Sequence, residues 1–343
     1  ELAAAGGGGP DGNHGRYDPE IMKLVLERMC LDAGVQVRLH TRICAALVDG
    51  RSIRAVVGES RAGREAWSAG CYIDCTGDGA LAAQAGCGFD IGHPDSGACQ
   101  PLSLMGLLTG IRADEVARFI CAMDNQAGKD ALLAELRAAG HDPSYGRPSL
   151  FRIHDDIFAL MANHQYGVRC DDADGISAAT IAARAEVHRM VGLLRARGGC
   201  WAGLRLVATG EQIGIREGRR IHGRYTVTTA DLAAGARHDD AVCRVKFGVD
   251  VHSLDPRHGK GYGAAGVRSQ PYDIPLRALI SADRDNLLMA GRCISGDFCA
   301  HASYRVTGNA VSMGWAAGVT AALAARSGRL PHEVGYEEVA KFL

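Results

Sequence analysis

Residues 72–92, YIDCTGDGALAAQAGCGFDIG, are the stretch of this 343-residue sequence that decides its fold class. A strand is predicted from around Trp67 to Asp74, and a helix of small residues is predicted from Ala80 to Ala85. Glycines in the connecting turn let the backbone approach a ligand closely, and α/β proteins bind ligands at the carboxyl ends of their strands. The stretch therefore predicts an α/β fold with a binding turn after this strand.

A second segment of the same kind lies near the end of the sequence. Residues 286–292, NLLMAGR, are predicted to form another strand that ends in glycine, and a helix is predicted from about Asn309 to Ala325. Gly308 and Asn309 would stand at the helix N-terminus, where free N–H groups and the positive end of the helix dipole point outward. This arrangement suits an electron-rich carbonyl or a negative charge on a ring, although an ordinary helix cap has the same spacing.

The rest of the chain alternates between helical and strand patterns. Asp18, followed by a proline and a glutamate, predicts the start of a helix that ends at Gly34. Further strands are predicted at 35–43, 47–57 (a hairpin), 204–210 and 242–251, and further helices at 113–123, 129–139 and 177–196. The polar run after residue 290 is predicted to be an irregular loop. We therefore expect a nucleotide-type domain built from discontinuous segments, with an inserted substrate domain.

Composition and charge exclude several classes of protein. The 38 basic and 39 acidic residues exclude a strongly basic nucleic-acid-binding protein, and 47% hydrophobic residues exclude a disordered chain. No run reaches the roughly 20 apolar residues of a membrane helix, so no membrane span is expected. The 12 cysteines include no CxxC pair and no zinc or iron–sulfur spacing. We therefore expect no metal site, and reduced thiols of a cytoplasmic protein.

Two literal GxGxxG matches occur, at residues 7–12 and 261–266. A dinucleotide-binding fingerprint needs a strand before the glycines and a helix after them, because the helix N-terminus supplies the anion site. The first match has no preceding strand, and the second has no following helix. Both are therefore interpreted as ordinary glycine-rich loops.

Several blocks of the sequence, in the same order, resemble the FAD-dependent oxidoreductase family that is related to the fumarate reductase and succinate dehydrogenase flavoproteins. The stretch at 72–92 resembles the ATGDG segment of that family. The other blocks are RYDPEIMKLVLERMCLDAGVQVRLHTRI (16–43), IREGRRIHGRYTVTTADL (215–232), NLLMAGRCIS (286–295) and SYRVTGNAVSMGWAAGVTAA (303–322). The resemblance is weakest at about 96–200. It implies a glutathione-reductase-like, Rossmann-type FAD-binding domain at 1–95 and 271–343, with an inserted α+β substrate domain at 96–270.

The resemblance also implies which residues would contact FAD. They are Thr76, Gly77 and Asp78 for the dinucleotide part, Gly291 and Arg292 for the pyrophosphate and ribityl chain, and Gly308 and Asn309 for the pyrimidine edge of the flavin. A helix N-terminus at that edge would stabilise the anionic reduced ring, which gives the last pair a physical reason.

Residues 301–309, HASYRVTGN, resemble the HGxNRxGGN-type run of the fumarate reductase relatives, in which the arginine holds a substrate carboxylate beside the flavin. Arg305 would do this because a planar guanidinium binds a carboxylate bidentately. His301 and Tyr304 are candidates for the group that moves a proton during hydride transfer. The alternatives are a surface or structural salt bridge for Arg305 and solvated loop positions for the other two. The charged cluster at 216–220 could bind an acidic substrate, but such clusters more often form solvated ion-pair networks.

We therefore expect a flavin-dependent oxidoreductase that transfers a hydride between FAD and a small organic substrate, with an external partner or oxygen as electron acceptor. The chain departs from the family because no βαβ unit with GxGxxG precedes Asp18. Either this unit is missing from the present sequence, or a second chain supplies it. The alternative is a non-catalytic remnant or subunit that cannot hold FAD alone. A hydrolase or lyase using His301 is a third possibility, but GxSxG and HExxH are both absent.

Overall fold

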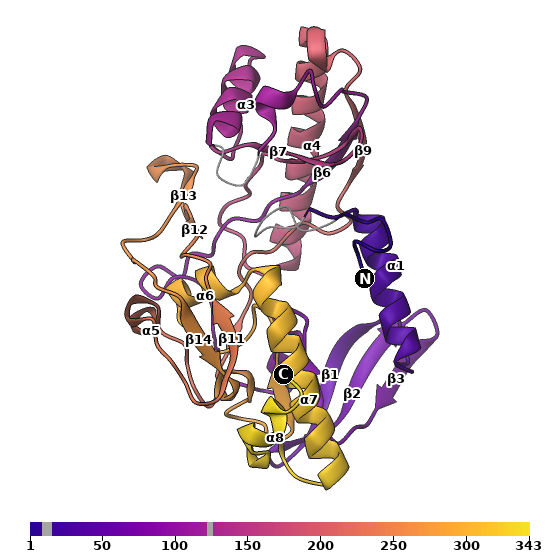
Figure 1. The fold of residues 1–343 in the computed structure, drawn as a ribbon, viewed down its shortest axis with the longest axis vertical. Coiled ribbons are helices and arrows are strands. Elements are labelled where there is room, and N and C mark those ends of the chain that lie inside the picture. The colour runs from indigo at the N-terminus through magenta and orange to yellow at the C-terminus, as the bar shows by residue number, and fades with distance from the viewer. Residues whose placement is uncertain (9–15, 122–125) are drawn as a thin grey trace.

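The structure is a computed structural model that describes residues 1–8, 16–121 and 126–343, and it has two lobes (Figure 1). The GxGxxG match at residues 7–12 lies mostly outside the described residues. The match at 261–266 lies around the short strand β13 and is not followed by a helix, as predicted. None of the helices in the described part of the chain combines the length and apolar character that a membrane span requires.

The upper lobe of Figure 1 contains a four-stranded antiparallel sheet in the order β7-β8-β6-β9, with helices α3 and α4 beside it. These elements are β6 (Gly106–Thr109), β7 (Ser149–His154), β8 (Ile157–Met161), β9 (Arg205–Thr209), α3 (Gln126–Ala138) and α4 (Ala173–Arg197). The lobe has its own apolar core, which includes the fully buried side chains of Phe119, Phe158 and Trp201.

The lower lobe contains the two glycine-turn segments, residues 72–92 and 286–292. Strand β4 (Tyr72–Asp74) pairs in parallel with β15 (Leu287–Met289), so that the two glycine turns leave the same edge. Helix α2 (Ala80–Gln84) follows β4, and the long helix α7 (Thr307–Ser327) follows the loop after β15. The antiparallel pair β11 (Ala241–Val245) and β14 (Tyr272–Pro275) shares a second, separate core with these elements.

A three-stranded antiparallel sheet, β1 (Arg42–Asp49), β2 (Ser52–Ser60) and β3 (Gly63–Trp67), stands at the side of the lower lobe with helix α1 (Pro19–Asp32) near it (Figure 1). Asp18 caps α1 as predicted, and β1 and β2 form the predicted hairpin. The predicted strand at 35–43 is wrong over most of its length, because strand structure begins only at Arg42. Val35, Val37 and Leu39 alternate, but they are exposed and not part of any ladder.

Three further segments differ from the predictions. The predicted helix at 113–123 is a single 3₁₀ turn (Ala117–Phe119) within the described residues, and 149–161, where no strand was predicted, form the β7–β8 hairpin. The polar loop after residue 290 contains the helix α6 (Phe298–Tyr304), which Asp297 caps by accepting the N–H of Ala300. The other short elements are β5 (Phe89–Asp90), β10 (Arg220–Ile221), β12 (Val251–His252), β13 (Tyr262–Gly263), α5 (Thr229–Ala234) and α8 (Tyr336–Ala340).

Candidate functional site

The turn after β4 is held in place by the buried side chain of Asp74. Its Oδ1 accepts the Thr76 backbone N–H at 2.9 Å and the Thr76 hydroxyl at 2.7 Å, while its Oδ2 accepts the N–H of Ala82 in α2 at 2.9 Å. Thr76 Oγ1 accepts the N–H of Ala80, the first residue of α2, at 2.9 Å. The Thr76 side chain therefore fixes the start of this short helix, and Asp74, which the sequence analysis did not single out, fixes the turn.

Arg292 connects the two glycine turns. It follows Gly291 after β15, and its guanidinium lies so close to Gly77 that a Cβ at Gly77 would overlap it. Its Nη2 donates to Asp78 Oδ1 at 2.8 Å, and Nη1 of Arg219 donates to the Asp78 carbonyl oxygen at 3.0 Å. The predicted residues of the two turns thus form one cluster at the carboxyl ends of the parallel strands.

The N-terminus of α7 carries no side-chain cap. Gly308 is exposed, and a Cβ built on it would meet no atom within 4 Å. Asn309 points inward, where its Nδ2 donates to the Tyr304 carbonyl oxygen at 3.2 Å and so links α7 to the preceding helix. An uncapped 21-residue helix with open space at its first turn suits an anionic or electron-rich partner.

Arg305 lies just before this helix, with only 11% of its side chain exposed. Its Nη2 donates to the Asp250 carbonyl oxygen at 2.8 Å and lies 3.3 Å from Asp250 Oδ2 and 3.5 Å from Gln100 Oε1. Burial lowers the pKa of Arg305, while the Asp250 carboxylate acts in the opposite direction. Arg305 thus makes the salt bridge that was the alternative to substrate binding, but its Nε has no hydrogen-bond partner among the described residues and remains an unused donor.

His301 and Tyr304 lie inside α6, and both are fully buried, so the alternative of solvated loop positions is wrong. The Tyr304 hydroxyl donates to the Ile294 carbonyl oxygen at 3.0 Å. Neither ring nitrogen of His301 has a partner in the described part of the chain. Burial, together with the positive charges of Arg305, Arg220 and Arg292, lowers the pKa of His301 well below its ordinary value. The role of His301 and Tyr304 in proton transfer stays a prediction.

The charged cluster at 216–220 is buried at its centre, which makes the expected solvated network wrong. Glu217 and Arg220 are almost inaccessible and form an ion pair of 2.6 Å. The Glu217 carboxylate also accepts the backbone N–H groups of Gly92 and Gln100, each at 2.9 Å. Protein donors therefore take the place of water around this carboxylate.

A buried network of polar side chains beside Arg305 was not predicted from the sequence. Asp250 Oδ2 lies 3.3 Å from His252 Nε2, and His252 Nδ1 lies 3.1 Å from Nε2 of His164. His252 is buried. A signal was present, because apolar Val249 and Val251 alternate with the two polar residues, and such alternation places Asp250 and His252 on one face of an extended segment.

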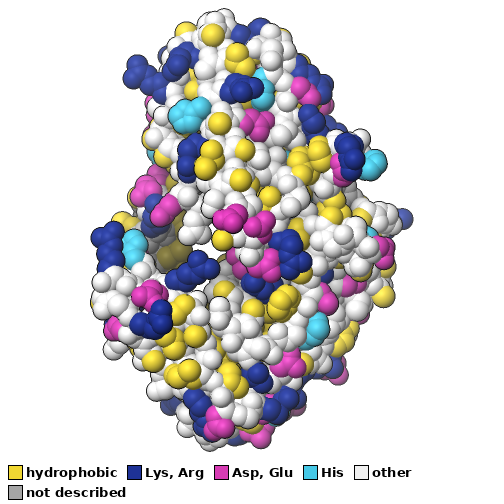
Figure 2. Space-filling model, turned by 180° about the vertical axis from the view of Figure 1, so that it is seen from behind, with side chains coloured by type: hydrophobic (Ala, Val, Ile, Leu, Met, Phe, Trp, Pro, Cys, Tyr) yellow, Lys and Arg dark blue, Asp and Glu magenta, His cyan; other side chains and the backbone are white. Residues whose placement is uncertain are grey.

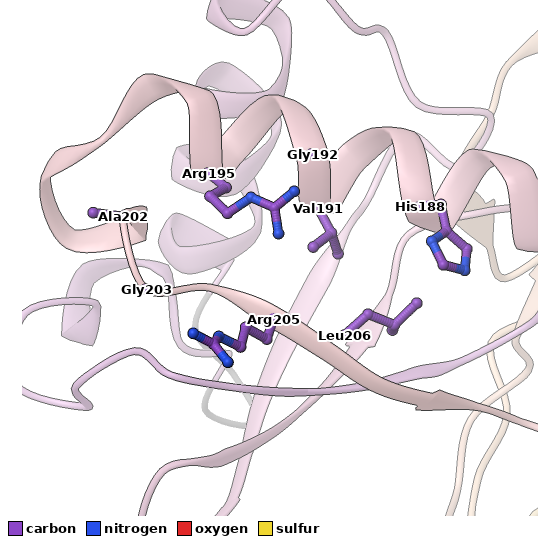
Figure 3. Close-up of a pocket in the computed structure, with 8 residues that line it drawn as sticks. All are labelled: His188, Val191, Gly192, Arg195, Ala202, Gly203, Arg205 and Leu206. Carbon is purple, nitrogen blue, oxygen red and sulfur yellow. The ribbon is translucent and has the colours of Figure 1, made fainter.

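Two pockets open on the upper lobe, away from Arg305. One, of about 520 Å³, lies between α4 and β9 (Figure 3). Its lining residues are His188, Val191, Gly192, Arg195, Ala202, Gly203, Arg205 and Leu206. The other, of about 430 Å³, is lined by Tyr166, Glu186 and Lys260 among others. Neither contains a residue that the sequence analysis singled out as a site residue. Within the described ranges, no group of three histidine, cysteine or acidic side chains is placed to hold a metal ion.

Comparison with known proteins assigns the lineage. A family model described as FAD dependent oxidoreductase matches residues 2–343. The chain belongs to this family. A search of curated proteins gave no match.

Solved structures that are similar to the chain are distant in sequence. A geranylgeranyl bacteriochlorophyll reductase-like protein from Thermoplasma acidophilum is 10% identical, with 98% of this chain and 61% of that chain covered and a TM-score of 0.44. A p-nitrophenol 4-monooxygenase from Pseudomonas putida is 9% identical, with 96% of this chain and 58% of that chain covered and a TM-score of 0.40. An L-proline dehydrogenase from P. horikoshii is 10% identical, with 92% of this chain and 57% of that chain covered and a TM-score of 0.34. The chain thus spans less than two thirds of the length of each of these proteins.

The residues between the lobes fit FAD, the cofactor of the family. Seven buried side-chain nitrogens in this region lack a hydrogen-bond partner among the described residues. They belong to Gln100, Arg219, Arg220, Arg292, His301 and Arg305. Buried polar nitrogens without partners are costly, and arginines beside glycine turns supply the positive charge and the hydrogen-bond donors that a pyrophosphate and an anionic ring require. Figure 2 shows basic and acidic side chains gathered where the two lobes meet, beside a hollow in the surface.

Proposed function

We propose that this chain binds FAD between the lobes and that it transfers a hydride between FAD and a small organic substrate that bears a carboxylate. The observation that carries the proposal is the position of Arg305, a buried arginine with an unused Nε just before the uncapped N-terminus of α7. FAD, when bound, supplies the chemistry of hydride transfer. Arg305 would orient the substrate, because a guanidinium binds a carboxylate in a fixed geometry.

The other site residues divide into groups that bind FAD and groups that move protons. Thr76, Gly77 and Asp78 would bind the dinucleotide part, Gly291 and Arg292 the pyrophosphate and ribityl chain, and Gly308 and Asn309 the pyrimidine edge. His301 and Tyr304 would hold or move the proton that accompanies hydride transfer. The open first turn of α7 and the position of the Arg292 guanidinium beside Gly77 support this assignment.

We further propose that residues 1–95 and 271–343 form a discontinuous, glutathione-reductase-like FAD domain and that 96–270 form the substrate domain. The parallel pairing of β4 with β15 supports the proposed FAD domain, and the separate core of the upper lobe, at residues 108–204, supports an inserted domain. Residues 221–249 of the proposed substrate domain pack in the core of the lower lobe. Within the described residues β4 pairs with β15 alone, so its other edge can accept a further strand. A βαβ unit, from this protein or from a second chain, would complete the FAD domain there. An external partner or oxygen would accept the electrons.

The alternative is a non-catalytic subunit that keeps the scaffold but does not hold FAD. An absorption spectrum distinguishes the two: the purified chain is mixed with FAD, passed through a gel-filtration column and scanned in the visible range. Retained flavin absorbance is expected. A colourless protein, both as purified and after FAD addition, contradicts FAD binding by this chain and favours the alternative.

Substitution of Arg305 tests its role in the reaction. Small acids and alcohols are screened as substrates of the FAD-loaded protein, and the acid that turns over is used with the Arg305→Lys variant. We expect turnover to fall about 100-fold with FAD still bound, because lysine keeps the charge but loses the bidentate geometry. Arg64→Lys, which changes a surface arginine on β3, is the matched control and should have no effect. Unchanged turnover in Arg305→Lys would exclude the proposed role.

A further inference from the structure

We propose that His164 and His252 form a proton relay that connects solvent at Tyr166 with Asp250 and Arg305. The relay follows a continuous series of contacts. The Tyr166 hydroxyl lies 3.3 Å from His164 Nδ1, His164 Nε2 lies 3.1 Å from His252 Nδ1, and His252 Nε2 lies 3.3 Å from Asp250 Oδ2. Asp250 Oδ2 is in turn 3.3 Å from Nη2 of Arg305. The relay rests on the proposed function, because it supplies that site with its proton.

Both histidines are electrically neutral in the folded chain. Burial, together with the positive charge of Arg216, lowers the pKa of His164 to about 2. Burial lowers the pKa of His252 to about 4, although the hydrogen bond with Asp250 raises it. Burial would raise the pKa of Asp250, but the hydrogen bond with His252 and the charges of Arg305 and Arg216 bring it below its ordinary value. The relay therefore joins neutral imidazoles to an ionised carboxylate.

These charges fix the position of each ring proton. An ionised carboxylate only accepts hydrogen bonds, so His252 must carry its proton on Nε2, which faces Asp250. His252 Nδ1 is then an acceptor, so His164 must carry its proton on Nε2. His164 Nδ1 is left as an acceptor that faces Tyr166. The hydrogen bonds from His164 to His252 and from His252 to Asp250 then point in one direction, as a relay requires. Tyr166 joins them when its hydroxyl rotates from the Ser144 carbonyl oxygen to His164.

Inward transfer moves one proton at each contact and no electrons. The proton on His252 Nε2 passes to Asp250 Oδ2, the proton on His164 Nε2 passes to His252 Nδ1, and the hydroxyl proton of Tyr166 passes to His164 Nδ1. Tyr166 regains a proton from a water molecule, which leaves as hydroxide into the solvent. The net result is one proton carried from water to Asp250, which lies beside the arginine that would hold the substrate.

The outer end of the relay opens to solvent and the inner part does not. Tyr166 is partly exposed and lines the pocket of about 430 Å³ on the upper lobe. Its hydroxyl also donates to the Ser144 carbonyl oxygen at 3.0 Å, so rotation of the hydroxyl switches its donor between Ser144 and His164. His164 and His252 are buried, with exposed fractions of 1% and 4%, and the centroids of their rings lie 4.9 Å apart. The other ionisable groups around them are Tyr145, Arg216 and Tyr262.

Nuclear magnetic resonance of the full chain, labelled with ¹⁵N at histidine and free of FAD, tests the arrangement. The ring nitrogens report which atom carries the proton, and the His164→Gln and His252→Gln spectra assign the signals. At pH 7 we expect both rings to be neutral with the proton on Nε2. A proton on Nδ1 of either ring, or a positively charged ring, would overturn the relay. This result does not depend on whether the chain holds FAD, so it separates the relay from the proposed function.

The rate at which dithionite reduces bound FAD tests whether protons use the relay. We expect His164→Ala to slow this reduction about tenfold, since a positioned proton carrier contributes at least that much, and added imidazole to restore the rate. His188→Gln, on the exposed face of α4, is the control and should keep the wild-type rate. An unchanged rate in His164→Ala, or a slow rate that imidazole does not restore, would show that His164 has only a structural role.

Discussion

At the scale of single residues, the site depends on arginines that are held without water. Arg220 illustrates how this is done: its Nη1 pairs with Glu217 at 2.6 Å, and its Nη2 donates to the Gly92 carbonyl oxygen at 3.0 Å. A buried ion pair recovers the cost of desolvation only when further hydrogen bonds satisfy both partners, and Glu217 accepts two backbone N–H groups besides the arginine. The pair therefore positions the segment between the lobes, while the Nε atoms of Arg220, Arg292 and Arg305 have no hydrogen-bond partner among the described residues.

Removing the charge of Glu217 is expected to destabilise the fold strongly. Glu217→Gln leaves Arg220 buried without a counter-charge, and loss of one partner from such a pair costs about 3 to 5 kcal/mol. Urea denaturation followed by circular dichroism measures this loss as a lower urea concentration at the midpoint of unfolding. Glu59→Gln, which breaks the exposed pair with Arg64, is the control and should leave the midpoint unchanged. Equal midpoints for Glu217→Gln and the wild type would contradict the account of this pair.

At the scale of elements, the important feature is the turn between β4 and α2. Gly77 has a φ of +75°, and the guanidinium of Arg292 lies where a Cβ would stand. Gly97 has a similar φ of +66° but lies in open space, where a Cβ would meet no atom within 4 Å. The two glycines therefore share the conformational requirement and differ in what surrounds them.

This difference allows the proposed binding role of the turn to be measured separately from its strain. Gly77→Ala and Gly97→Ala should each cost about 1 kcal/mol of folding free energy, because alanine is disfavoured at positive φ. Only Gly77→Ala should also weaken FAD binding, by about tenfold or 1.4 kcal/mol, since it displaces Arg292. Titration of each purified variant with FAD, followed by fluorescence quenching, checks this. Equal affinities in the two variants would show that the turn does not contact the cofactor.

At the scale of the whole molecule, the sequence predicted those parts of the fold that local patterns specify. The cap of α1 at Asp18, the β1–β2 hairpin, α2 and most of α7 follow from spacing and turn residues within a few positions. The β7–β8 hairpin was missed because its stability comes from long-range pairing in the upper sheet. The contact between His164 and His252 was missed for the same reason. His252 and His164 are 88 positions apart, and no local pattern indicates that they touch.

Three buried histidines should make the stability of the whole chain depend on pH. The pKa values of His164 (about 2), His252 (about 4) and His301 (well below its ordinary value) are all lowered by burial, so the unfolded chain binds more protons than the folded one below about pH 6.5. The unfolding free energy should therefore fall as pH drops from 6.5, by about 1.4 kcal/mol per pH unit for each histidine, and the contribution of His252 should level off near pH 4. His301→Leu should remove one such contribution, whatever it does to stability at pH 7. Urea denaturation of the FAD-free chain at half-unit steps from about pH 5 to 7 measures how steeply the unfolding free energy changes with pH in the wild type and in His301→Leu. If His301→Leu kept the wild-type slope, His301 would be protonated in the folded chain, and its place as a neutral, buried group facing the arginines of the site would have to be abandoned.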